Sequence, residues 1–243
     1  MRERRHYSKA PITQALIDIQ VQSGHLLDLA VLASPPPEIA ADYPGILPVF
    51  TGNATISMNP GDATKFEAKQ IGYSRTGKTE HKYALQARLD GLTVSRLAPY
   101  ETWEQLRDEF LRVWEWYAAI VQPDSITRLA VRYSNRLDLP LPFRDFKDYL
   151  CTTPEIGGDL PAGLSGFIMQ LQIPMPDLTG MVVLNEAIVP PARDGVASIM
   201  LDIDVFQTGN LSNNFLKELE ALHDKEKTFF EGSITDKTRE LIT

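Results

Sequence analysis

Cysteine and long apolar runs are what this 243-residue chain has least of. Cys151 is the single cysteine, so an internal disulfide is excluded and cysteine alone cannot complete a metal site. No run approaches the length that spans a membrane, and the segment after Arg2, Arg4 and Arg5 lacks the continuous apolar core of a signal peptide. We therefore expect a cytoplasmic protein in a reducing compartment, without a membrane partner.

Positive charge is also in deficit. The chain has 24 basic and 32 acidic residues, and 24 − 32 gives the net charge of −8. This balance argues against broad binding to nucleic acid, because such binding depends on basic side chains that neutralise phosphates. The hydrophobic share of 43% is ordinary for a globular protein that is long enough to bury a core.

The strongest pattern in the sequence is a helix followed by a strand. Thr102 and Gln105 have the spacing of a capping box, and Gln122-Pro123 ends the pattern because proline cannot continue a helix. Between these signals, apolar residues recur at steps of three and four, which predicts a helix with one buried stripe. The stripe consists of Trp103, Leu106, Phe110, Val113, Tyr117 and Ile120.

The strand that follows is predicted from Ile126 to Leu139, where apolar residues occupy most odd positions. Arg128, Arg132 and Arg136 fall on even positions, so they point to the opposite face of the same strand. We expect the apolar face to pack against the helix.

Strands are also predicted at 10–22, 49–58, 65–74, 166–173, 180–189 and 196–206. Residues 82–97 predict a β-hairpin that closes at Asp90-Gly91, with Ala87 facing Val94 on an apolar side. A second long helix is predicted within residues 211–232, and Glu226 lies near the centre of its apolar stripe. Because an unpaired buried charge is costly, we expect Glu226 to lie at the edge of that stripe.

These elements predict an α+β fold in which antiparallel sheet is covered on one face by two long amphipathic helices. We expect one domain over residues 1–243. The strings PDSIT and EGSIT, which follow the two helices, leave open an alternative with two similar halves, 1–140 and 141–243.

Four motifs carry a resemblance to a known family: PITQALIDI, SRLAPYETWEQL, LAVRYSNRLDLP and SITDKTRELI. The chain resembles a sporadically distributed prokaryotic family of uncharacterised proteins, over nearly its whole length. The resemblance supports this layout of elements and implies no activity, cofactor or catalytic residue.

One motif suggests nucleotide chemistry. Gly72, Gly77, Lys78 and Thr79 match the P-loop expression letter for letter, and in a true P-loop such residues cradle phosphates and hold Mg²⁺. A P-loop must pass from a parallel strand into a helix, whereas the residues after Thr79 alternate as a strand. We therefore expect a hairpin turn here and keep a nucleotide-binding or hydrolysing enzyme as the alternative function.

No catalytic set, cofactor site or metal site is predicted. Asp202 and Asp204 form a D-x-D pair on one strand face, but the sequence offers no third ligand beside them, and solvated or ion-paired carboxylates are the simpler interpretation.

The favoured function is binding of a protein or peptide partner through an open polar sheet face. Guanidinium groups make directed hydrogen bonds to carboxylates, so a row of arginines suits such recognition. The residues predicted for this face are Arg128, Arg132, Arg136, Asp18, Asp202 and Asp204. Three alternatives stay open: pairing among these residues that holds the strands in register, a homodimer, and a small-ligand site between helix and sheet.

Overall fold

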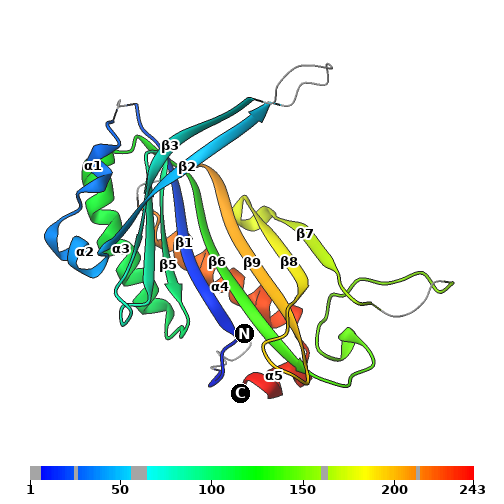
Figure 1. Cartoon of the computed structure of the whole chain (residues 1–243). Coiled ribbons are helices and arrows are strands. Elements are labelled where there is room, and N and C mark those ends of the chain that lie inside the picture. The colour runs from blue at the N-terminus through cyan, green and yellow to red at the C-terminus, as the bar shows by residue number, and fades with distance from the viewer. Residues whose placement is uncertain (1–6, 25–26, 56–64, 160–163, 212–213) are drawn as a thin grey trace.

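The structure is a computed structural model of the chain, and it describes residues 7–24, 27–55, 65–159, 164–211 and 214–243. Within these ranges the strands form one nine-stranded antiparallel sheet in the order β2-β3-β4-β5-β1-β6-β9-β8-β7 (Figure 1). The strands are β1 Ile12–Gln22, β2 Gly45–Thr55, β3 Lys65–Thr76, β4 Tyr83–Arg88, β5 Gly91–Leu97, β6 Ser125–Pro140, β7 Ile168–Met175, β8 Gly180–Val189 and β9 Val196–Leu211.

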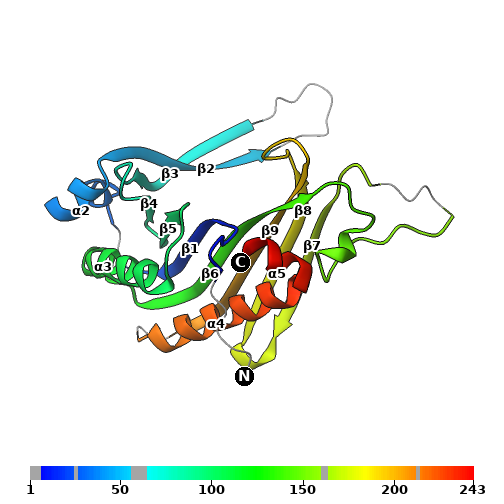
Figure 2. The ribbon, with the colours of Figure 1, turned by 90° about the horizontal axis from the view of Figure 1, so that it is seen from below.

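Two long helices, α3 Trp103–Val121 and α4 Leu216–Ser233, lie on the same side of this sheet (Figure 2). Helix α3 packs on β5 and β1, and α4 packs on β6 and β9. Three short helices complete the described part of the chain: α1 Ala30–Ala33, α2 Pro37–Asp42 and α5 Asp236–Ile242. The predicted α+β class is confirmed. Among the described residues, no helix combines the length and the apolar character needed to cross a membrane.

Helix α3 begins and ends where the sequence predicts. The Thr102 hydroxyl accepts a hydrogen bond from the backbone N–H of Gln105 at 3.3 Å, and Gln122 adopts the left-handed conformation that ends many helices. The predicted stripe is buried against the sheet, apart from Ile120, which is half-buried. Phe110 lies at its centre with no exposed surface.

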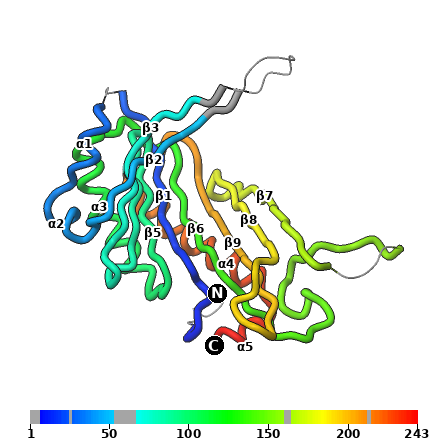
Figure 3. The backbone as a smooth tube through the Cα atoms, viewed as in Figure 1, coloured from blue at the N-terminus to red at the C-terminus, as the bar shows by residue number. Residues whose placement is uncertain are grey.

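The central strand pair, β1 and β6, runs side by side through the middle of the sheet (Figure 3). Ile17 pairs with Val131 and Ile19 with Leu129, and all four side chains are buried on the side of the helices. Asp18 pairs with Ala130 and therefore faces the opposite side.

Strand order is symmetric about this central pair apart from β2, which has no counterpart beyond β7 among the described strands. The meander β3-β4-β5 joins β1 and is followed in the chain by α3, and the meander β7-β8-β9 joins β6 and is followed by α4. In this order β6 is the counterpart of β1, so a boundary between the two sets falls between α3 and β6 and not after residue 140. The two SIT strings differ in structure, since Ser125 begins β6 whereas Thr235 precedes α5. The duplication itself stays a prediction.

The predicted hairpin over residues 82–97 is confirmed, but its register differs from the expected one. Arg88 pairs with Gly91, and Ala87 pairs with Leu92 instead of Val94, so the turn is Leu89-Asp90. A Cβ at Gly91 would lie 2.5 Å from the carbonyl oxygen of Ile19. Glycine is therefore required for the close approach of β5 to β1, and it is not the turn residue that Asp90-Gly91 suggested.

We expect Phe110→Ala to lower the free energy of unfolding by about 3–5 kcal/mol, because it removes a fully buried ring from the α3 stripe. Glu104→Ala, at an exposed position one turn and a half earlier in the same helix, is the matched control and should cost little. Denaturant melts of the two variants measure the difference. Equal losses would contradict the orientation of α3.

Candidate functional site

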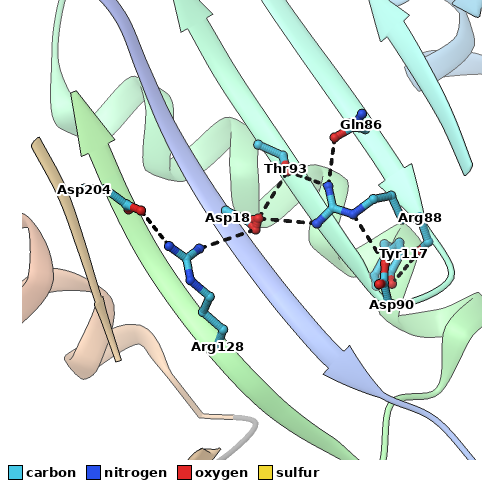
Figure 4. A network of polar contacts seen from close by, with 8 residues as sticks. All are labelled: Asp18, Gln86, Arg88, Asp90, Thr93, Tyr117, Arg128 and Asp204. Carbon is cyan, nitrogen blue, oxygen red and sulfur yellow. Dashed lines mark hydrogen bonds and ion pairs between the residues drawn. The ribbon is translucent and has the colours of Figure 1, made fainter. Parts of the chain in front are cut away.

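The open face, defined as the side of the sheet opposite α3 and α4, carries a network of ion pairs (Figure 4). Arg88 on β4 contacts Asp18 on β1 at 3.3 Å. Arg128 on β6 lies between two carboxylates, 3.8 Å from Asp18 and 2.7 Å from Asp204 on β9. Opposite charges therefore pair across β1, β6 and β9, and Arg88 on β4 reaches Asp18 past β5, which lies between β4 and β1.

A second cluster on the open face centres on Asp202. Arg132 donates two hydrogen bonds to its carboxylate, at 2.8 and 2.9 Å, and Ser134 and Asn185 donate two more at 2.7 and 3.0 Å. Burial by itself raises the pKa of Asp202, but the hydrogen bonds from Arg132 and Ser134 outweigh it and hold that pKa below its ordinary value. For Asp204 burial wins over the attraction of Arg128, and the pKa of that carboxyl is raised.

The open face is close to neutral within this network. Its four arginines each pair with an aspartate, the third predicted arginine, Arg136, contacts Asp138 at 3.2 Å, and Arg88 also contacts a fifth aspartate, the exposed Asp90, at 3.3 Å. The pairs are Arg88–Asp18, Arg128–Asp204, Arg132–Asp202 and Arg136–Asp138. All six predicted residues thus lie on the open face, but Arg136 contacts none of the other five, and the pairs suit the alternative of holding strands in register. Arg132 is the most exposed arginine of the four, with 45% of its side chain accessible.

The P-loop-like string lies at a hairpin, as the sequence predicts. Gly72 belongs to β3, Gly77 is in the turn, and Lys78 and Thr79 are exposed before the chain enters β4. A Cβ at Gly72 would lie 2.1 Å from the carbonyl oxygen of Ala87, so strand packing accounts for this glycine. The string does not precede a helix N-terminus, which is the feature that holds phosphate in a P-loop.

A cavity of about 1050 Å³ lies on the helix side, where the sequence left open a small-ligand site between helix and sheet but did not predict its residues. Its wall combines the segment before β1, the segment that leads into α3, the middle of β6 and one face of α4. Aromatic rings from all four parts line it: Tyr7, Tyr100, Trp103, Tyr133, His223 and Phe230.

The aromatic wall is held by contacts between these rings. The hydroxyl groups of Tyr100 and Tyr133 share a hydrogen bond of 2.7 Å, and their rings meet edge to face at 5.4 Å. Trp103 stacks on His223 at 4.1 Å between ring centroids, and its Nε1 donates to Glu220 at 2.9 Å. Other side chains of the protein therefore hold these rings in place, so the wall is preorganised before any ligand binds.

Glu226 lines this cavity and is 3% exposed, so the expectation that it lies at the edge of the α4 stripe was wrong. Among the described residues, its carboxyl has no hydrogen bond and no ion pair, and Lys227 is the one charge that acts on it. Burial raises the pKa of Glu226 to about 8, with Lys227 lowering it in part. Glu226 is therefore buried beside the cavity as a neutral acid. The prediction of a place at the edge of the stripe considered only the ionised form.

Three more groups that line the cavity, His223, Tyr100 and Tyr133, are neutral near pH 7. Burial lowers the pKa of His223 to about 4, and burial raises the pKa of both Tyr100 and Tyr133 above the ordinary value. Three acids of the wall are already paired with arginines that lie outside the wall. These pairs are Glu101–Arg96, Glu220–Arg107 and Glu231–Arg239.

A second buried carboxyl, Glu186 on β8, has no exposed surface and neither of its carboxylate oxygens is hydrogen-bonded in the described structure. Burial raises its pKa to about 7. Of these two buried carboxyl groups, Glu226 lines the cavity and Glu186 does not.

Comparison of the sequence with protein-family models finds no match, and comparison with curated proteins finds no match either. The described residues contain no group of three His, Cys, Asp or Glu side chains placed to hold a metal ion. What the protein does must therefore be inferred from the geometry of the open face and the cavity.

The buried acid should make stability depend on pH. Folded protein keeps the Glu226 proton up to about pH 8, whereas the unfolded chain loses it near the ordinary pKa of 4.5. The unfolding free energy of wild type should therefore fall, relative to Glu226→Gln, as pH rises between these values, by at most about 1.4 kcal/mol per pH unit. Denaturant melts from pH 5 to 9 measure this, with exposed Glu240→Gln as the control. Parallel curves for wild type and Glu226→Gln would contradict it.

Proposed function

We propose that this protein is a non-catalytic binding protein that takes a small organic ligand into the cavity between α3, α4 and β6. The observation that carries the proposal is Glu226, a buried carboxyl without a partner that lines a preorganised aromatic cavity. The carboxyl of Glu226 reaches the cavity, so a ligand bound there can make the hydrogen bond that no described residue makes with this group.

The size and lining of the cavity favour an organic molecule over water alone. Pockets for small ligands have volumes of about 300–1,000 Å³ and combine apolar walls with a few polar groups. This cavity is of that size, and its polar groups converge from β6 and α4 on one aromatic surface. Binding is favoured over catalysis because His223, with its pKa near 4, is a poor base at neutral pH.

The test uses bulk placed in the cavity wall. Asp224→Trp adds an indole at an exposed α4 position that lines the cavity, and Lys217→Trp adds the same group to α4 outside it. We expect some members of a fragment library, neutral and charged, to raise the melting temperature of wild type and Lys217→Trp but not of Asp224→Trp. An equal response of all three proteins, or no response of wild type, would overturn the proposal.

A second candidate function is recognition of a protein or peptide partner through the open face, in the cytoplasm, as the sequence suggests. One observation favours it: Arg132 keeps 45% of its side chain accessible although it makes a bidentate pair with Asp202. A guanidinium in this position can donate to a partner without breaking its own pair.

This candidate is tested by removing both charges of one pair. The double variant Arg132→Gln/Asp202→Asn leaves no buried charge alone, so its melting temperature should stay near that of wild type. Affinity capture from the source cells, read by mass spectrometry, should lose the partners that wild type recovers. A matched change at Arg107 and Glu220, which pair between the helices, is the control. Recovery of the same partners by both variants would remove the open face from consideration.

A further inference from the structure

We propose that the ligand of the cavity is an organic cation, an ammonium or guanidinium group that sits beside the Glu226 carboxylate with its organic body against Tyr100, Trp103 and Tyr133. This inference rests on the proposed function and adds the chemical class of the ligand. Three observations support it. The wall has an unpaired negative charge when Glu226 is ionised, aromatic rings line it, and metal ions and neutral ligands fit it less well.

Charge is the first feature. Once the acids that are paired with arginines are set aside, the charged groups that remain in the wall are Glu104, Asp224 and Glu226 against Lys9 and Lys227. With Glu226 protonated, the two remaining acids and the two lysines cancel. With Glu226 ionised, the wall carries one negative charge more than it can neutralise. A single cationic ligand group supplies that missing charge, and an anion would add to the imbalance.

The aromatic faces are the second feature. Tyr and Trp rings attract ammonium and guanidinium groups through the negative face of the ring, and this attraction grows when the site is shielded from water. Tyr100, Trp103 and Tyr133 stand close to Glu226 in the wall, and the charge of Glu226 acts on both tyrosines. His223 does not compete as a cation, because burial keeps it neutral near pH 7.

Other ligand classes fit less well. A hard metal ion requires three or more oxygen or nitrogen ligands, and the described residues do not gather three such acidic, histidine or cysteine side chains. A neutral ligand would leave the Glu226 carboxyl protonated, able to donate one hydrogen bond, and would gain nothing from the aromatic faces beyond apolar contact. These classes differ in whether Glu226 loses its proton when the ligand binds.

Binding of a cation should therefore release a proton. The O–H bond of the Glu226 carboxyl breaks, the carboxylate stays beside the ligand, and the proton passes to the buffer. Apart from the acids paired with arginines, the titratable and charged groups that line the cavity with Glu226 are Lys227, Asp224 and His223 from α4, Tyr133 from β6, Tyr100 and Glu104 from the α3 side, and Lys9 and Tyr7 from the segment before β1. Of these, Lys9 and Lys227 are the basic side chains, and Lys227 lowers the pKa of Glu226 in part. Affinity for the cation should rise up to tenfold per pH unit below about pH 8 and level above it.

The experiment compares matched ligands by calorimetry. The cations are 2-phenylethylamine, benzylguanidine and hexylamine, and the neutral isosteres are 2-phenylethanol, benzylurea and hexanol. We expect cations to bind wild type at pH 7 at least tenfold more tightly than their isosteres. Measurements in two buffers of different ionisation enthalpy should show a proton released for each cation bound, close to one at pH 7.

Two substitutions locate the effect. Glu226→Gln keeps the shape of the protonated acid and cannot ionise, so it should weaken cation binding at least tenfold and abolish proton release. Glu240→Gln makes the same change at an exposed residue outside the wall and should alter affinity less than threefold. The proton count is measured on wild type and needs no variant, so it decides the question even where Glu226→Gln does not fold.

The failures of the two proposals are distinguishable. Neutral isosteres that bind as tightly as the cations, without proton release and without a loss in Glu226→Gln, would overturn the cation inference while the cavity remains a ligand site. Binding that is equal in Asp224→Trp, or no binding of any fragment or matched ligand to wild type, would overturn the cavity proposal itself and the inference with it.

Discussion

The register of β1 on β6 is the constraint on which the rest of the structure depends. Pairing Ile17 with Val131 directs one set of side chains towards α3 and α4 and the alternate set towards the open face. In a strand the side-chain period is two, so a slip of one residue would exchange these sets. Tyr133 would then leave the cavity, and Arg132 would enter the apolar layer without Asp202. Both candidate sites therefore follow from one alignment of two strands.

The two faces handle their charges in opposite ways. On the open face, aspartates and arginines of different strands meet at ion-pair distance, and each of these charges finds its counter-charge within the sheet. On the helix side, Glu226 is enclosed without a counter-charge. Ion pairs between neighbouring strands help to specify pairing, whereas a lone buried acid brings no stability of its own. A lone buried acid such as Glu226 is therefore more readily explained by a ligand that it binds than by a structural role.

The fold was predictable from the sequence where the signals are local. The cap at Thr102, the stripe through Phe110 and the alternation along β6 are each written within a few residues, and each element forms as predicted. The hairpin register was missed because Gly91 fits two interpretations, and close packing on Ile19, a residue far away in the chain, decides between them. The pairing of the arginines with Asp18, Asp202 and Asp204 was foreseen as an alternative, since the faces follow from alternation alone.

The cavity could not be predicted, because its wall is assembled from residues near 10, 100, 133 and 225. The central place of Glu226 on the α4 stripe was the one signal in the sequence. The cost of burying an unpaired charge led to the prediction that Glu226 lies at the edge of the stripe, because that cost applies to an ionised carboxylate. Only the packing of α4 across β6 and β9 shows that a protonated acid beside open space satisfies the same rule.

Two contacts join the segment before β1 to the C-terminal helices. The hydroxyl of Tyr7 donates to Glu231 at 2.6 Å across 224 residues of sequence, and the backbone N–H of Lys9 donates to the carbonyl of Ile242 at 3.0 Å. Tyr7 and Glu231 both line the cavity, so its wall is complete only when the two ends of the described chain lie against each other.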